Sequence, residues 1–137
     1  MKLRTKHIKV DTRDTHKEAC MIVEESLNEH SRKIYSMGGM IVGEEIYPSS
    51  NSTKSFFTLR YDIEPKVKQL VQYKYNVYNI IDVADSAISN MENEEIINLE
   101  KKGNDVLRLM HFPKLNTAYT QLLIAYVKKE VEKNEQK

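Results

Sequence analysis

The stretch QYKYNVYNII, residues 72–81, decides how the second half of the chain folds. Read as a helix, it spreads Tyr73, Tyr75 and Tyr78 around the helical wheel, so that each ring packs separately against the rest of the protein. Read as a strand, it places Tyr73, Tyr75 and Val77 on one face, where aromatic rings can stack on bases. The residues on either side favour the helix, and the strand is kept as the alternative.

A heptad pattern runs through this region. Apolar residues recur every seven positions from Leu70 to Met91, and Pro65 suits the first position of a helix because its φ angle is already helical. We therefore expect one amphipathic helix over 65–91, and we expect two copies of the protein to pair along its apolar seam. The predicted interface consists of Leu70, Val77, Ile81, Ala84, Ile88 and Met91.

The first half of the chain has the pattern of a small sheet with one covering helix. Thr15 and Glu18 have the spacing of a capping box, and an apolar helical face follows them. Gly43 interrupts an apolar run and indicates a bulge or a close backbone approach. The predicted elements are strands over 2–10, 39–47 and 55–63 and a helix over 15–32.

Two further helices are predicted after the long one. Apolar residues from Ile96 to Met110 have helical spacing, and Asn116 is a suitable N-cap for a last helix. The predicted fold class is α+β: a small antiparallel sheet with the order β-α-β-β, followed by a helical C-terminal half with one long amphipathic helix. We expect one domain, with residues 1–63 forming the sheet part, 65–134 the helical part and 128–137 a frayed tail. We find no internal repeat.

Charge and cysteine content limit the partners and the compartment. The chain of 137 residues has 21 basic and 20 acidic side chains, so no global field attracts nucleic acid or an anionic membrane. Residues 1–15 contain no apolar segment of signal-peptide length, and no run is long enough to cross a bilayer. Its only cysteine, Cys20, cannot form an internal disulfide. We expect a cytoplasmic protein that contacts no membrane.

The common catalytic and cofactor motifs are missing from the sequence. It contains no glycine-rich phosphate loop, no CxxC pair and no GxSxG nucleophile motif. His16 and Cys20 lie four residues apart, but a zinc site needs three or four ligands. We therefore expect no enzyme activity, no cofactor and no metal. The alternative is a Mg²⁺-dependent nucleotide pyrophosphatase whose ligands would be Asp82, Asp85, Glu92 and Glu95.

A non-catalytic binding protein is the function that this profile favours. Its target would be a host protein or an anionic, nucleotide-like small molecule, bound by a homodimer or a higher homo-oligomer. Small inhibitor proteins of phages and mobile elements have a similar profile, which is an analogy of size and composition alone. A weaker alternative is a regulator that contacts DNA. The candidate ligand-binding residues are Arg60, Tyr73, Lys74, Tyr75 and Arg108.

Overall fold

The first half of the chain forms one β-α-β-β unit. A computed structural model describes residues 1–11, 18–47, 54–66, 72–81, 85–113 and 119–129. The elements of the first unit are β1 (Leu3–Asp11), α1 (Ala19–Ser36), β2 (Met40–Tyr47) and β3 (Lys54–Asp62). Its strands pair antiparallel in the order β1-β3-β2, which we call the first sheet. These elements lie close to the four that the sequence predicts there, and β2 contains a bulge between Ile41 and Gly43.

The capping box is not the start of α1. The helix begins at Ala19, and its N-cap residue Glu18 makes no side-chain capping hydrogen bond. Thr15 lies outside the described residues. The helix also continues to Ser36, four residues beyond the predicted end at 32.

The second half of the chain forms a second unit, and the predicted helical C-terminal half is wrong. Its elements are β4 (Lys74–Ile81), α2 (Asp85–Lys101), β5 (Asn104–Pro113) and β6 (Tyr119–Lys128). The strands pair antiparallel in the order β4-β6-β5, which we call the second sheet. The predicted helix over 65–91 is replaced by β4 and the start of α2, and the two later predicted helices are largely β5 and β6. The long seam therefore does not exist as one helical face.

The two units repeat the same architecture. The bulge of β2 recurs in β5 between Val106 and Arg108. The two registers match when 65 is added to each residue number, so that β2 corresponds to β5 and β3 to β6. Each helix is followed by a glycine with positive φ, Gly38 at 81° and Gly103 at 86°, a conformation that other residues rarely adopt. The same offset relates Pro48 to Pro113. The statement that the chain has no internal repeat is therefore wrong.

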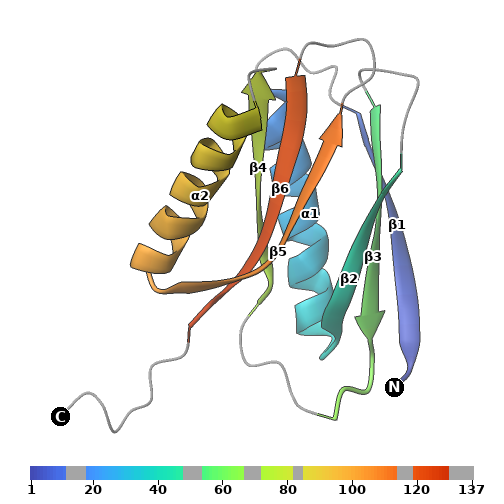
Figure 1. Ribbon diagram of the computed structural model, residues 1–137. Coiled ribbons are helices and arrows are strands. Elements are labelled where there is room, and N and C mark those ends of the chain that lie inside the picture. The colour runs from blue at the N-terminus through green and yellow to red at the C-terminus, as the bar shows by residue number, and fades with distance from the viewer. Residues whose placement is uncertain (12–17, 48–53, 67–71, 82–84, 114–118, 130–137) are drawn as a thin grey trace, which may run out of the picture.

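The elements stack as a series of layers, with α2 on one side and the first sheet on the other (Figure 1). Helix α1 and the second sheet share the core with the inner face of the first sheet. Helix α2 packs on the opposite face of the second sheet. Strand β6 is consequently covered on both faces, and Leu122, Leu123, Ile124 and Ala125 are all buried. Among the described helices, none is long and apolar enough to cross a membrane.

Candidate functional site

The two units differ in what covers the outer edge of their first strand. In the second unit, α1 lies beside β4 and bonds to its backbone. The Tyr75 N–H donates to Asn28 Oδ1 at 2.8 Å, and Asn28 Nδ2 donates to the Tyr75 carbonyl at 2.9 Å. The Val77 N–H donates to Glu24 Oε1 at 2.9 Å. Ser31 donates its hydroxyl to the Tyr73 carbonyl. Helix α1 thus closes this edge, as a neighbouring strand would.

The equivalent edge of β1 has no such cover among the described residues. Thr5 pairs with Arg60 in the first unit as Tyr75 pairs with Ala125 in the second, so Thr5 corresponds to Tyr75, and His7 corresponds likewise to Val77. Thr5 and His7 are exposed, and within the described part of the chain no group bonds to their outward-pointing backbone. We call this edge of β1 the open edge.

The outer face of the first sheet is also without a covering element in the part of the chain that the structure describes. Alternation along the strands places the side chains of His7, Glu45, Tyr47, Phe56, Thr58 and Arg60 on it. We call it the open face. The equivalent face of the second sheet is buried against the first unit and is apolar, because Leu123 stands where Thr58 stands and Met110 where Glu45 stands. No described element packs on the open face.

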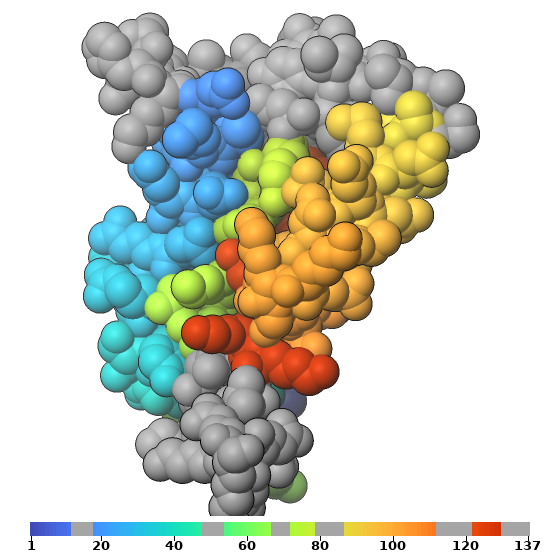
Figure 2. Space-filling model, turned by 90° about the vertical axis from the view of Figure 1, so that its left-hand side faces the viewer, coloured from blue at the N-terminus to red at the C-terminus, as the bar shows by residue number. Residues whose placement is uncertain are grey.

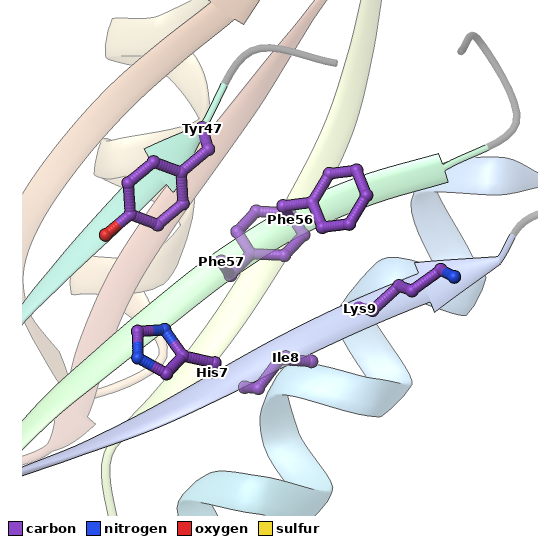
Figure 3. A pocket seen from close by; sticks show the side chains of 6 residues that line it. All are labelled: His7, Ile8, Lys9, Tyr47, Phe56 and Phe57. Carbon is purple, nitrogen blue, oxygen red and sulfur yellow. The ribbon is translucent and has the colours of Figure 1, made fainter.

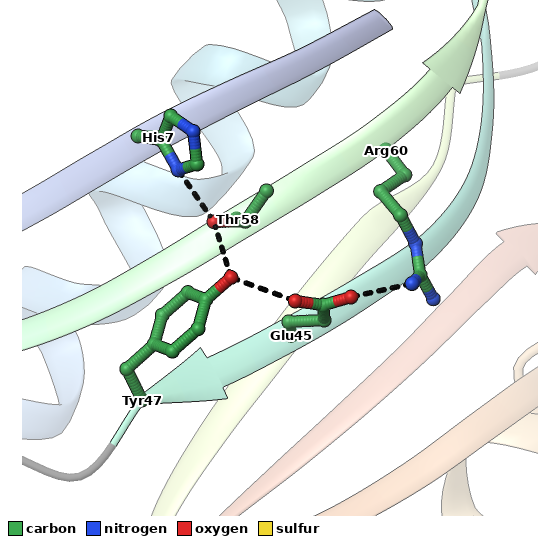
Figure 4. Close-up of polar contacts among 5 residues, drawn as sticks. All are labelled: His7, Glu45, Tyr47, Thr58 and Arg60. Atoms are coloured by element: carbon green, nitrogen blue, oxygen red, sulfur yellow. Dashed lines mark hydrogen bonds and ion pairs between the residues drawn. The ribbon is translucent and has the colours of Figure 1, made fainter. Parts of the chain in front are cut away.

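A row of hydrogen bonds orders the polar side chains of the open face (Figure 4). His7 Nδ1 bonds with Thr58 Oγ1 at 2.8 Å, and Thr58 donates to the Tyr47 hydroxyl at 3.3 Å. Tyr47 donates to Glu45 Oε2 at 2.7 Å, and Arg60 donates to Glu45 Oε1 at 2.5 Å. Because Thr58 gives its single proton to Tyr47, His7 Nδ1 is the donor to Thr58. The Glu45 carboxylate therefore accepts one hydrogen bond from Tyr47 and another from Arg60.

Beside this row lies a shallow hollow of about 170 Å³ (Figure 3). Tyr47, Phe56 and His7 line it from the open face, with Phe57 and Ile8 beneath and Lys9 at its side. The volume is below the several hundred Å³ that small-molecule pockets usually have. A hollow of this size has room for about one side chain between the aromatic rings and the polar row.

A larger groove lies between β4 and α2. Residues of β4 reach the surface between the two helices (Figure 2). The groove has a volume of about 420 Å³, and burial raises the pKa of its Tyr78 to about 12. Tyr78 accepts a hydrogen bond from Asn76 Nδ2 at 2.9 Å and also bonds to Glu95. The lining residues are Asn76, Tyr78, Glu95, Asn98, Leu99, Lys101 and Lys102.

Three of the five predicted ligand residues come together, but inside the molecule. Tyr75 is fully buried, and its hydroxyl donates to Glu44 Oε2 at 2.7 Å. Arg108 donates to both oxygens of the same carboxylate, each at 2.6 Å, and its guanidinium lies 5.7 Å from the centre of the Tyr73 ring. Burial raises the pKa of Tyr75 well above its usual value, and Glu44 raises that of Arg108. This cluster joins β2 to the second sheet.

The other two predicted ligand residues lie apart from this cluster. Arg60 is on the open face, with its guanidinium over Gly43, and Lys74 is exposed at the start of β4. The stacking alternative for residues 72–81 assumed a strand, which the structure has. However, its two central residues, Tyr75 and Val77, face the core, so that they offer no platform to a base.

The predicted dimer residues do not share a face. Val77 is buried in β4, whereas Met91 is exposed on α2 and Ile88 packs beneath the same helix. The side chain of Ile81 is not described, and Leu70 and Ala84 lie outside the described residues. Homodimer formation remains a prediction, but the helical seam on which it was based is wrong.

The proposed metal ligands are divided in the same way. Glu92 pairs with His111 of β5, and Glu95 bonds to Tyr78. Asp82 lies outside the described residues, and the side chain of Asp85 is not described. Among the side chains that the structure describes, no three His, Cys, Asp or Glu are grouped as a metal site would need.

Sequence reasoning missed both parts of the site that the fold creates. The polar residues Glu24, Asn28 and Ser31 recur along one side of the helix, but in sequence this spacing is the same as that of a solvated face. The polar alternation of 56–62 was visible, but not its pairing with His7. Comparisons with protein-family models, curated proteins and solved structures find no match to the chain.

Proposed function

We propose that the protein is a non-catalytic binding protein and that its open face receives a protein partner. One observation carries the proposal: the chain builds the same unit twice, and the face that is buried in the second unit has no cover from the described residues in the first. The buried copy shows that a face in this position can pack against other elements. The uncovered copy is polar, so that it is compatible with solvent until a partner arrives.

The chemistry of the open face favours a protein over a small ligand. The hollow beside Tyr47 and Phe56 has room for one side chain, and the row from His7 to Glu45 offers fixed acceptors and donors around it. Aromatic rings surrounded by ordered polar groups are typical of the centre of protein interfaces. Inhibition of a host protein and assembly as a homo-oligomer remain predictions. We also retain the cytoplasmic location, where a free thiol such as that of Cys20 is ordinary.

A matched pair of variants tests this proposal. Tyr47 on the open face and Met91 on α2 are both 43% exposed, so that Tyr47→Asp and Met91→Asp place the same charge at equally accessible positions. Immobilised wild type and both variants are compared for the proteins that they retain, and native mass spectrometry gives the stoichiometry of each complex. We expect one partner to remain on Met91→Asp and to be lost from Tyr47→Asp. The reverse pattern would transfer the interface to α2, and equal retention would refute a role for the open face.

An anionic small molecule is the second candidate ligand, and the groove beside α2 is the observation that favours it. Lys101 and Lys102 line this groove together with the Tyr78 ring, and its volume is within the range of ligand pockets. A nucleotide that binds there raises the melting temperature of the wild type but not of Lys101→Ala/Lys102→Ala. Hydrolysis of the nucleotide, with Mg²⁺ required, would instead support the pyrophosphatase alternative.

A further inference from the structure

We propose that the open edge of β1 binds an acidic, extended segment of the partner, which adds to the first sheet as a fourth strand. The proposal rests on the binding function proposed above and names the chemistry of the partner. Three observations support it: the comparison of the β1 edge with the equivalent β4 edge, the positive charge around β1, and the direction of the β1 backbone groups.

The copy at β4 shows which groups satisfy such an edge. There, three side chains of α1 take up backbone groups of Tyr73, Tyr75 and Val77, and the acceptors include the carboxylate of Glu24. The corresponding groups of Thr5 and His7 have no counterpart among the described residues. A strand that pairs with β1 would satisfy them all at once, as in other complexes formed by strand addition.

The direction of the free groups follows from the pairing with β3. The Ile63 N–H donates to the Lys2 carbonyl at 3.0 Å, so that Lys2 belongs to a hydrogen-bonded pair. In an antiparallel ladder such pairs alternate, and therefore Arg4 and Lys6 also direct their backbone groups toward β3. Thr5, His7 and Lys9 therefore each direct a backbone donor and a backbone acceptor away from β3.

Positive charge surrounds these groups on both faces of the sheet. Arg4 and Lys6 lie on one face of β1 and Lys9 on the other, and all three are exposed. Burial and then the nearby charges of Lys6 and Lys33 lower the pKa of His30, so that Lys6 of β1 lies near this side of α1. Like charges oppose the pairing of two β1 strands, whereas glutamate or aspartate on an added strand would be attracted by them. A second copy of this chain is thus the disfavoured occupant.

The probe is a synthetic peptide that alternates glutamate with valine and is long enough to pair with the nine residues of β1. Amide hydrogen exchange of the full chain is measured with and without it. We expect new protection at Thr5, His7 and Lys9 and no change at Arg4 and Lys6, whose amides already bond to β3. A peptide of the same length with lysine in place of glutamate is expected not to bind.

Two pairs of variants separate charge from backbone pairing. Arg4→Glu/Lys6→Glu should weaken peptide binding at least about tenfold, whereas Lys101→Glu/Lys102→Glu, an equal charge change at the C-terminal end of α2 and in the turn after it, should not. Thr5→Pro removes an outward N–H and should weaken binding, whereas Thr5→Ala removes the same side chain and should not. Proline is tolerated at an edge whose N–H faces solvent, and circular dichroism checks the fold of each variant.

Three results would overturn the proposal. One is tight binding of single-stranded DNA without new protection of the β1 amides, which would identify a polyanion site. Another is protection of Thr5 and His7 that appears with protein concentration alone, which would identify a second copy. The third is an absence of peptide binding. Failure of the peptide to bind, with the protein partner still retained by Met91→Asp and lost from Tyr47→Asp, would refute the strand addition alone. That combination would leave the proposed function of the open face intact.

Discussion

Two ion pairs among the described residues join arginine to glutamate in opposite surroundings. Arg108 and Glu44 meet between the sheets, where the Glu44 side chain is 1% exposed and Arg108 32%. Arg60 and Glu45 meet on the open face, where both side chains are about two-fifths exposed, at 40% and 41%. In the first pair the Glu44 carboxylate is shielded from water and also accepts from the Tyr75 hydroxyl. Stability therefore depends on one pair far more than on the other.

Replacing each arginine by alanine should change the free energy of unfolding by different amounts. In Arg108→Ala the buried Glu44 carboxylate loses two charge-assisted hydrogen bonds, so that the free energy of unfolding should fall by about 2 kcal/mol or more. In Arg60→Ala the change should be within about 1 kcal/mol, because the pair is solvated. Urea denaturation measures both. Equal losses would mean that the Glu44 cluster is not the joint between the sheets.

At the scale of elements, α1 has two separate functions. Its apolar side covers the first sheet, and its polar side closes the edge of β4. The equivalent position of Asn28 in the second unit is Asn93, which is exposed on α2 and has no edge to close in the described part of the chain. Asparagine thus stands at both equivalent positions, but only Asn28 bonds to a strand edge among the described residues.

This pair gives a controlled test of the edge contact. Asn28→Ala leaves the N–H and the carbonyl of buried Tyr75 without partners and should lower the free energy of unfolding by about 2–3 kcal/mol. It should also speed hydrogen exchange of the Tyr75 amide. Asn93→Ala should change stability by less than about 0.5 kcal/mol. If Asn93→Ala were as damaging as Asn28→Ala, the edges would not differ as described.

The same elements explain what the sequence could and could not predict. In the first unit, strand β3 alternates between a buried and an open face, and its period of two was readable. In the second unit, both faces of β6 are covered, so that apolar residues occupy every position from Leu122 to Ala125. Such a run carries no period and resembles a helix core. Spacing therefore favoured a last helix where the structure has β6, and the heptad spacing from Leu70 to Met91 likewise favoured a helix where Tyr75 and Val77 lie in a strand.

Part of the candidate site was accessible from sequence, and part was not. Arg60 was identified because it stands on the polar side of an alternating strand. The open edge could not be found in this way, because the residues of a strand do not reveal whether another element bonds to its backbone. The signal that was available lay in the offset of 65, which relates Gly38 to Gly103 and Asn28 to Asn93. Recognition of that repeat would have placed a glycine after α2 rather than inside a helix.

At the scale of the whole molecule, the two units share one core. Tyr75, Val77, Leu123 and Ala125 of the second unit pack in the same cluster as the apolar side of α1. Neither unit can expose this surface without a large hydrophobic penalty. The chain should therefore unfold as one cooperative body even though it is built from two copies of one motif.

A core truncation tests this cooperativity. Leu123→Ala removes a fully buried side chain at the junction and should cost about 2–5 kcal/mol. Amide signals from β3 in the first sheet and from β6 in the second should then be lost at the same urea concentration. Separate midpoints for the two sheets would show that each unit is stable by itself, which would contradict a shared core.

The most direct measurement of the difference between the two edges is residue-resolved amide hydrogen exchange of the free protein. The amides of Tyr75 and Val77 bond to α1 and should exchange slowly, as should those of Arg4 and Lys6, which bond to β3. The amides of Thr5 and His7 should exchange faster by orders of magnitude, so that fast and slow residues alternate along β1. Equal protection at Thr5, His7, Tyr75 and Val77 would mean that the edge of β1 is already covered, and the binding surface inferred from it would not exist.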